Sequence, residues 1–177
     1  MKHQGTKLLK TSRLLLRKFS LNDCDNFYNN WASDDRVTRY VTWPTHTDIS
    51  ITKTLVEQWI KNYNDNTYYQ WIIDLKDIKQ AIGSISVVRI DEEKSEIELG
   101  YCIGYDFWNK GYTTEAFQKV IEYLFNEVQV EKIIARHDSR NIGSGRVMEK
   151  CGMKFIGTME DVNKGENIIL KLYELKR

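Results

Sequence analysis

The 177 residues suffice for one domain with a sizeable core, and 26 Lys and Arg against 25 Asp and Glu leave a net charge of only +1. No overall field therefore favours nucleic acid or an acidic membrane surface as a partner. No run of about 18 apolar residues indicates a membrane span, and the polar start does not resemble a signal peptide. We expect a single domain over residues 1–177, located in the cytoplasm.

The three cysteines and three histidines set further limits. Cys24, Cys102 and Cys151 are widely spaced and odd in number, which indicates reduced thiols rather than a disulfide framework. Neither the cysteines nor the histidines have metal-ligand spacing, so no metal is assigned. No histidine forms a recognisable pair with a cysteine, which argues against a cysteine nucleophile.

The N-terminal third of the chain predicts one strand and two helices. Residues 13–19 form a strand between polar turns, and residues 22–31 form a short helix after a capping signal at Ser20. A second helix follows Asp48. Its apolar residues recur at helical spacing and predict one buried face: Ile51, Leu55, Val56, Trp59 and Ile60.

Three strands are predicted next, over residues 68–75, 81–90 and 95–103. Short charged linkers join them, which is typical of an antiparallel meander. A helix over 113–127 and a strand over 132–138 follow. A strand, a helix and a second strand in this order form a crossover, and we expect its two strands to be parallel.

The C-terminal segment predicts a helix over 142–151 that Gly152 ends, followed by strands over 153–162 and 166–175 around a turn at 163–165. The whole order is typical of an α/β domain. We expect a mixed, mostly antiparallel central sheet of six to seven strands flanked by about four helices.

The segment IELGYCIGYDFWNKGYTTEA, residues 97–116, leads from a predicted strand through a short loop into an amphipathic helix. The first turn of a helix has N–H groups without intrahelical partners, and a preceding glycine such as Gly111 lets a phosphate approach them. Lys110 adds positive charge, and the hydroxyls of Thr113 and Thr114 can donate hydrogen bonds. The segment therefore predicts an anion-binding site.

An ordinary turn is the alternative for this segment, with Gly111 at the bend, Thr113 as the helix cap and Lys110 in solvent. The two common nucleotide motifs are absent, because the chain contains neither G-x-x-x-x-G-K-[ST] nor G-x-G-x-x-G.

A family resemblance favours the anion site. The stretch WNKGYTTEA resembles the acetyl-CoA signature of the GCN5-related N-acetyltransferase (GNAT) family. The family's Q/R-x-x-G-x-G/A pattern falls on Trp108, Gly111 and Thr113, so the central glycine matches and the outer positions differ. The stretch NIGSGRVMEKCGM, residues 141–153, resembles the family's N-x-x-A/S segment. The opening SRLLLRKFSLND resembles the first strand of the branch that contains ribosomal-protein-alanine N-acetyltransferases.

The resemblance implies a GNAT-like fold with a splayed pair of parallel strands, and acetyl-CoA as cosubstrate. Coenzyme A would bind through its diphosphate to the loop and helix start, through its pantetheine to the strand edge, and through its arm to the later helix. The implied cofactor-binding residues are Tyr101, Cys102, Ile103, Trp108, Asn109, Lys110, Gly111, Tyr112, Thr113, Asn141 and Ser144. An N–H near Ile103 would stabilise the oxyanion of the thioester.

Two residues are candidates for catalysis. Glu98 alternates with the apolar residues of its strand and lies beside the implied thioester position, where a carboxylate could take a proton from the amine; the alternative is an exposed structural glutamate. Ser144 could contact the cofactor or protonate the departing thiolate, or it could be a helix-surface serine. Many relatives have a tyrosine acid where this chain has Met148, and methionine cannot donate a proton.

The acceptor is expected to be a primary amine. The branch resemblance implies the α-amine of a protein N-terminus, attacked directly, while a polyamine, an amino acid or an aminoglycoside is the runner-up. Trp43, beside Pro44 in a loop, is the candidate acceptor contact. A coenzyme A-binding module without catalysis, or a pure interaction domain, remains the alternative class, and the chain would act as a monomer or homodimer.

Overall fold

One eight-stranded sheet forms the centre of the computed structural model, which describes residues 1–177. Its order is β1-β2-β3-β4-β5-β6-β8-β7, and every neighbouring pair is antiparallel except β5 and β6. The strands are β1 (Leu9–Lys10), β2 (Leu14–Arg17), β3 (Gln70–Leu75), β4 (Gln80–Asp91), β5 (Glu96–Ile103), β6 (Lys132–Asp138), β7 (Lys154–Asn163) and β8 (Glu166–Lys176). The predicted α/β class, meander and parallel crossover are confirmed.

Five α-helices accompany the sheet: α1 (Cys24–Phe27), α2 (Asp35–Thr38), α3 (Ile49–Asn62), α4 (Tyr112–Tyr123) and α5 (Ile142–Lys150). The predicted helix over 22–31 is a tight turn at Leu21–Asp23, then α1, then a wide turn at Tyr28–Ala32. The tight start follows from Asp23, whose carboxylate accepts the Ser20 N–H at 2.7 Å. None of the helices is long and apolar enough to cross a membrane.

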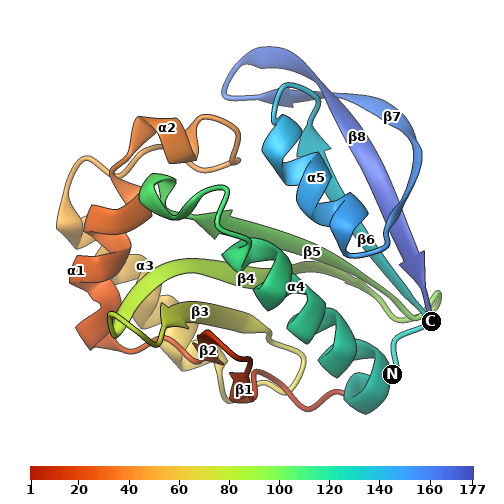
Figure 1. Cartoon of the computed structure of the whole chain (residues 1–177), viewed down its shortest axis with the longest axis horizontal. Helices are drawn as coiled ribbons and strands as arrows, with labels where there is room; N and C mark the ends of the chain where they lie inside the picture. The colour runs from red at the N-terminus through yellow and green to blue at the C-terminus, as the bar shows by residue number, and fades with distance from the viewer.

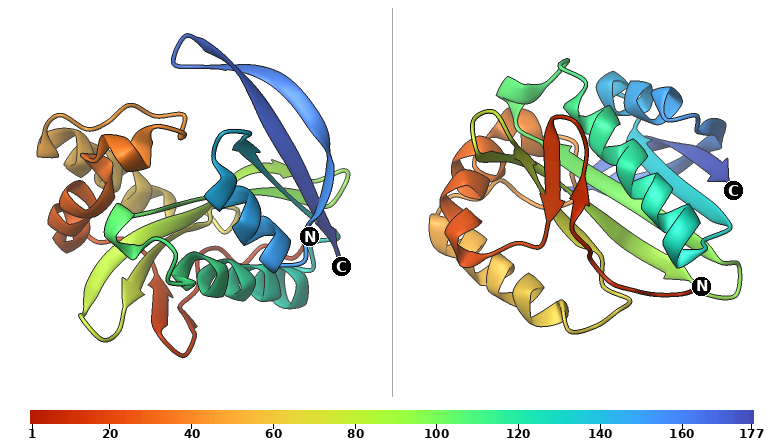
Figure 2. Two further views of the ribbon diagram at one scale, coloured as in Figure 1. Left: turned by 45° about the horizontal axis from the view of Figure 1, so that its top comes forward. Right: turned by 60° about the horizontal axis from the view of Figure 1, so that its bottom comes forward.

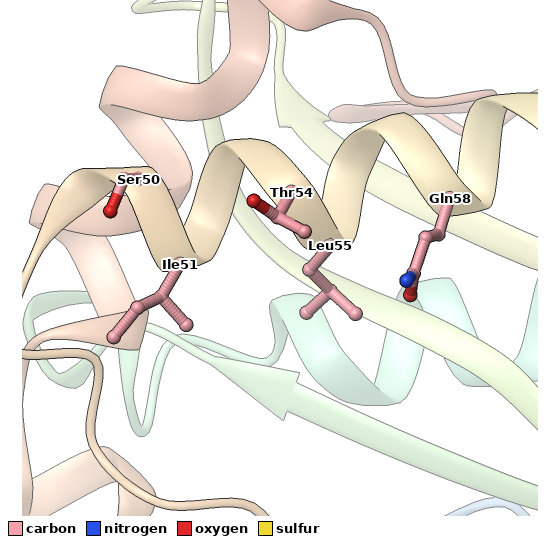
Figure 3. A pocket seen from close by; sticks show the side chains of 5 residues that line it. All are labelled: Ser50, Ile51, Thr54, Leu55 and Gln58. Atoms are coloured by element: carbon pink, nitrogen blue, oxygen red, sulfur yellow. The ribbon is translucent and has the colours of Figure 1, made fainter.

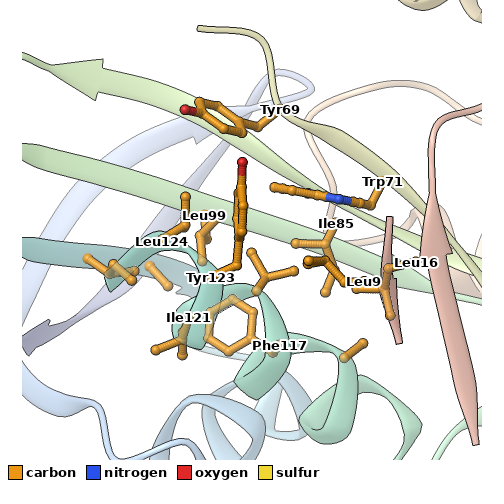
Figure 4. Packing of buried hydrophobic residues seen from close by; sticks show 14 of the residues in the cluster. Leu9, Leu16, Tyr69, Trp71, Ile85, Leu99, Phe117, Ile121, Tyr123 and Leu124 are labelled. Carbon is orange, nitrogen blue, oxygen red and sulfur yellow. The ribbon is translucent and has the colours of Figure 1, made fainter. Parts of the chain in front are cut away.

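The helices cover both faces of the sheet, which gives two cores. β3 shows the division: Trp71 and Ile73 point into a cluster of 24 buried residues beneath α4, and Ile72 points into a cluster of nine on the opposite face. Figure 4 shows the first cluster, where Phe117 and Tyr123 of α4 pack against the strands. Because both faces are covered, β3 is almost entirely buried, unlike a half-solvated strand.

The parallel strands β5 and β6 separate toward their carboxyl ends. Their pairing runs only from Glu96 with Lys132 to Leu99 with Ala135. Beyond it, residues 100–103 pair with β4 alone and residues 136–138 pair with β8 alone. We call this opening the strand gap. Figures 1 and 2 show β5 and β6 diverging, with α4 and α5 on one side and the long β7–β8 hairpin curving away.

Candidate active site

The β5 edge of the strand gap has free main-chain groups. The Gly104 N–H donates to the Ile82 carbonyl on β4 at 2.8 Å. Alternate residues of a strand point their main-chain groups to opposite edges, so those of Tyr101 and Ile103 face the gap. The Trp108 indole donates to the Ile103 carbonyl at 2.9 Å, which is consistent with this direction. An extended ligand can therefore pair with this edge as an added strand would.

The loop over residues 108–111, which we call the cofactor loop, leads directly into α4. Asn109 and Gly111 both have left-handed backbone, with φ of 59° and 79°. Gly111 is the N-cap of α4, and no side chain caps this helix end. The first-turn N–H groups are thus left without a side-chain acceptor. Thr113 is buried in the helix and is not the cap, so that part of the ordinary-turn alternative is wrong.

An ion pair fixes the cofactor loop to the first hairpin. Glu115, in the first turn of α4, accepts hydrogen bonds from Thr11 Oγ1 at 2.6 Å, from Ser12 Oγ at 3.1 Å and from Arg13 Nε at 2.6 Å. Arg13 Nη1 also donates to the carbonyl of Lys110 at 3.0 Å. Desolvation alone would raise the pKa of Glu115, but these hydrogen bonds outweigh it and lower the pKa to about 2.

Arg13 also brings positive charge to the loop, a contribution that the sequence analysis did not include. Its guanidinium lies over the Tyr112 ring, with Cζ 4.5 Å from the ring centroid. A Cβ added at Gly111 would lie 3.4 Å from Arg13 Nη2. Arg13 is far from Glu115 in sequence, and no spacing rule predicts their contact.

The start of α5 meets β5 across the strand gap. Asn141 caps α5, and its side-chain oxygen accepts the Ser144 N–H at 3.3 Å. The Tyr101 hydroxyl donates to the Ser144 carbonyl at 2.8 Å and lies 2.8 Å from Ser144 Oγ, so the serine hydroxyl donates to Tyr101. The Tyr101 ring packs on Phe117 of α4 at 5.0 Å between centroids. Tyr101, Asn141 and Ser144 therefore form one group.

Glu98 lies on the opposite face of β5 from this group. The residue is only 4% exposed, and Arg136 Nε lies 2.5 Å from one carboxylate oxygen while Arg89 Nε lies 3.4 Å from the other. Glu96, two residues earlier, is held in the same way by Arg89 at 2.5 Å and Lys132 at 2.6 Å. The structure thus separates the two catalytic candidates, with Glu98 on one face and Ser144 on the other.

Trp43 lies on the Glu98 side of the sheet, in the loop between α2 and α3. It is half-buried and packs against His46, with 5.4 Å between ring centroids. His46 hydrogen-bonds to Thr52 at 2.7 Å, and burial lowers the pKa of the imidazole. Trp43 and Cys102, which lies at the end of β5, both pack against the cluster of nine buried residues on this face. Trp43 and Cys102 therefore lie on the same face of the sheet as Glu98.

A surface hollow on α3 is separate from this site. It is lined by Ser50, Ile51, Thr54, Leu55 and Gln58. Figure 3 shows that these side chains come from successive turns of α3 alone. α3 packs on the face of the sheet opposite α4, so the hollow lies away from the cofactor loop. With walls from a single helix, it does not enclose a ligand.

The site combines a strand edge open to a linear ligand with a helix start at a glycine that can hold phosphate. These two features define a class of α/β proteins that bind a phosphate-bearing cofactor across a splayed sheet. The family comparison makes the class specific. A model described as "Acetyltransferase (GNAT) domain" matches residues 13–154. The match covers well over half of the chain, so the protein belongs to the GNAT family of acetyltransferases, whose acetyl donor is acetyl-CoA.

Two similar relatives come from bacteria. The chain is 29% identical over 165 residues to uncharacterized N-acetyltransferase p20 of Bacillus licheniformis, covering 93% of this chain and 92% of that protein. It is 34% identical over 146 residues to uncharacterized N-acetyltransferase YnaD of Bacillus subtilis, covering 82% of each. Both matches cover most of the relative's length, which agrees with the family assignment.

Solved structures share the fold. A GNAT-family acetyltransferase from Bacillus anthracis superposes with a TM-score of 0.85 at 28% identity, covering 96% of this chain and 98% of that one. The structure of RimL, a ribosomal L7/L12 alpha-N-protein acetyltransferase, in complex with coenzyme A gives a TM-score of 0.85 at 14% identity and covers 96% of this chain and 98% of that one. At that identity the second likeness concerns the fold alone.

Proposed function

We propose that this enzyme transfers the acetyl group of acetyl-CoA to a primary amine by direct attack, and that the amine is the N-terminus of a polypeptide. The observation that carries the proposal is the strand gap beside the cofactor loop. Main-chain groups of Tyr101 and the N–H of Ile103 border the gap, and the start of α4 at the exposed Gly111 has no side-chain cap. Both features suit a long ligand with an amide-bearing arm and a diphosphate.

The residues fit coenzyme A at three places. The N–H groups of residues 108–113 would hold the diphosphate, and Lys110 and Arg13 would add positive charge. The edge of residues 101–103 would hydrogen-bond the pantetheine amides. Asn141 and Ser144 would contact the arm near the gap. Cys102 lies between Tyr101 and Ile103 in the strand, with its main chain paired to β4 and its side chain packed into the cluster on the other face, so it would line the site without donating to the cofactor.

The chemistry then requires a proton acceptor and an oxyanion donor. The neutral amine forms a bond to the thioester carbon, the carbon–sulfur bond breaks, and coenzyme A leaves as the thiolate. The Ile103 N–H would stabilise the oxyanion, and Glu98 would take the amine proton directly or through water. Ser144 would pass a proton from water to the thiolate, since Met148 cannot donate one and the raised pKa of the buried Tyr101 hydroxyl makes that group a weak acid.

The acceptor assignment is supported by the branch resemblance of residues 12–23. A small amine such as a polyamine, an amino acid or an aminoglycoside would use the same opening. Trp43 would contact the acceptor in either case, because it lies on the Glu98 side of the gap.

Two measurements test the proposal. Calorimetry should detect acetyl-CoA binding, and release of free thiol should be followed with short peptides bearing free N-termini, with spermidine, with free amino acids and with an aminoglycoside. The peptides should be the best acceptors. A preference for a small amine would show that the acceptor is not a polypeptide N-terminus. Binding of acetyl-CoA without thiol release from any amine would indicate a non-catalytic module. Absence of binding would disprove the assignment to acetyl-CoA.

A further inference from the structure

The turn of the β7–β8 hairpin reaches across the molecule to the α2 segment, by which we mean α2 and the loop after it, residues 35–45. Lys164 Nζ donates to the Thr38 carbonyl at 2.7 Å, and Asn163 Nδ2 donates to the Val41 carbonyl at 3.2 Å. Figure 1 shows the hairpin turn on the same side of the molecule as the loop after α2, and the Lys164 and Asn163 side chains span the distance between them. We call these two hydrogen bonds the bridge. They join segments that are more than 120 residues apart.

The geometry of the turn prepares Lys164 for this contact. Lys164 and Gly165 both have left-handed backbone, with φ of 52° and 81°, between the paired residues Asn163 and Glu166. Such a two-residue turn matches the twist of the hairpin and holds its tip in one conformation. Lys164 is an exposed residue, but its ammonium group is partly desolvated at this contact, which lowers the pKa of that group.

The carbonyl on the other side of the bridge is equally well held. Thr38 is 1% exposed, and its hydroxyl lies 2.6 Å from the Thr45 hydroxyl, which in turn donates to Asp35 at 2.5 Å. This network fixes the segment that receives Lys164. The bridge therefore connects two ordered elements.

A third contact lies beside the bridge. The Arg140 guanidinium lies 5.9 Å from the centroid of the Tyr40 ring. Arg140 is itself fixed by Asp138 at 2.7 Å and by Glu166 at 3.4 Å. The loop before α5 and the hairpin turn thus both face the α2 segment, and charge on Arg140 reinforces the connection.

The bridge closes a ring around the Glu98 side of the strand gap. The strand register places Ile168 and Leu170 of β8 on the same face of the sheet as Glu98. They are 7% and 8% exposed, whereas Ile169 on the other face is 51% exposed. On this inner face the β8 residues near the bridge are thus buried, whereas Met159 of β7, which pairs with Leu170, is 39% exposed. The ring consists of the end of β5, the α2 segment, the bridge and this inner face of β8.

We propose that Lys164 and Asn163 are specificity-determining residues: by closing this ring they admit a thin, extended acceptor, such as the end of a flexible chain, and exclude amines on a folded protein surface. This inference rests on the proposed function, since it takes the Glu98 side of the gap as the acceptor entrance. The selection is steric, because a bulky acceptor must break the bridge before its amine reaches the thioester.

Loss of the bridge provides the test. The double variant Lys164→Met with Asn163→Ala removes both hydrogen bonds, and Lys154→Met removes the same charge from the exposed start of the same hairpin. The two acceptors are a hexapeptide with a free N-terminal alanine and ubiquitin with an acetylated N-terminus, which offers only surface lysines. The ratio of kcat/KM for ubiquitin to kcat/KM for the peptide should rise at least ~10-fold in the bridge variant and stay constant in Lys154→Met. An unchanged ratio would overturn the proposal.

Hydrogen exchange gives a readout that needs no acceptor. Amides of residues 36–45 should exchange faster in the bridge variant than in the wild type or in Lys154→Met, and equal rates would mean that the bridge does not form in solution. If the wild type acetylates spermidine and not the peptide, only the assignment of a polypeptide N-terminus as acceptor is wrong. The ratio of kcat/KM for ubiquitin to kcat/KM for spermidine then tests the bridge in the same way. Absence of thiol release from every amine in both proteins would end both proposals.

Discussion

The two sides of the strand gap are built in different ways. On the α4 and α5 side, the cofactor loop, the β5 edge and the helix starts come from two short stretches, 97–116 and 141–144, and they present mainly main-chain groups. On the Glu98 side, the walls come from the α2 segment, the Arg89 and Arg136 side chains and the β7–β8 hairpin. Their contacts are made by side chains that are distant in sequence.

Under the proposed function, each side of the gap would recognise a different kind of ligand. A diphosphate and a pantetheine arm are invariant, so fixed main-chain donors and a glycine suffice for them. An acceptor differs between enzymes, and side chains on loops and a hairpin can change without disturbing the sheet. A variant on the first side should therefore change the affinity for acetyl-CoA, and a variant on the second should change turnover or the choice of acceptor.

The largest effect is expected for Glu98→Gln. If Glu98 takes the amine proton, the amide variant should lower kcat by about 100-fold, because general base catalysis typically contributes that much or more. The affinity for acetyl-CoA should stay within a factor of about two. Steady-state kinetics and calorimetry on the same preparation would separate the two quantities.

Glu96→Gln is the matched control for that variant. Glu96 is on the same strand and face, is equally buried and is also held by two cations. It should lose stability, as Glu98→Gln does, and retain turnover. Equal loss of kcat in both variants would show that the carboxylates act only through the ion pairs.

Gly111→Val should have the next largest effect, on the opposite side of the gap. A β-branched residue at φ +79° is strained, and its Cβ would lie 3.4 Å from Arg13 Nη2. Acetyl-CoA should bind about 10-fold more weakly by calorimetry, since strain of this kind costs about 1–3 kcal/mol. Gly152→Val, at φ +82° after α5, carries the same strain away from the loop and should leave the affinity unchanged.

Periodicity in the sequence was sufficient to predict the long elements. The strand over 132–138 matches β6, and α3, α4 and the meander match to within a few residues, because each has enough turns or alternations to show its period. β1 and α2, of two and four residues, were missed because they are too short to show one. Packing and hydrogen bonds with other segments, rather than their own pattern, define them.

The same limit applies to the site. The loop at Gly111 and the helix start at Asn141 could be predicted, since local motifs carry them. The pairing of Arg13 with Glu115 and the bridge from Lys164 to Thr38 could not, because each joins residues that only the fold brings together. Glu98 was placed on the correct face by alternation, but its burial depends on Arg89 and Arg136, which alternation does not reveal.

A smaller effect, on stability, is expected for Glu115→Gln. The carboxylate accepts four hydrogen bonds from Thr11, Ser12 and Arg13, and its pKa is lowered to about 2 from an ordinary value near 4.5. A lowered pKa stabilises the folded state above the ordinary value, and this stabilisation is lost as the pH falls from about 4.5 toward 2.

Urea denaturation would measure that effect. At pH 7 the variant should be less stable by about 1–2 kcal/mol, because hydrogen bonds to a charged group are lost. The difference from the wild type should shrink as the pH approaches 2. A difference that is constant with pH would contradict the assigned charge. The affinity for acetyl-CoA should fall as well, since the loop would no longer be fixed.

The smallest effect is expected for Cys102→Ala and Cys151→Ala. Burial raises the pKa of each thiol to about 12, so both are protonated at neutral pH and are poor nucleophiles. Each variant should keep kcat within a factor of about two, because alanine fills a similar space and direct attack by the amine needs no thiol. Steady-state assays at pH 8, with iodoacetamide labelling of the wild type alongside, would check both statements. Loss of turnover in either variant, or rapid labelling that abolishes activity, would instead require an acetyl-cysteine intermediate and would remove direct attack from the mechanism.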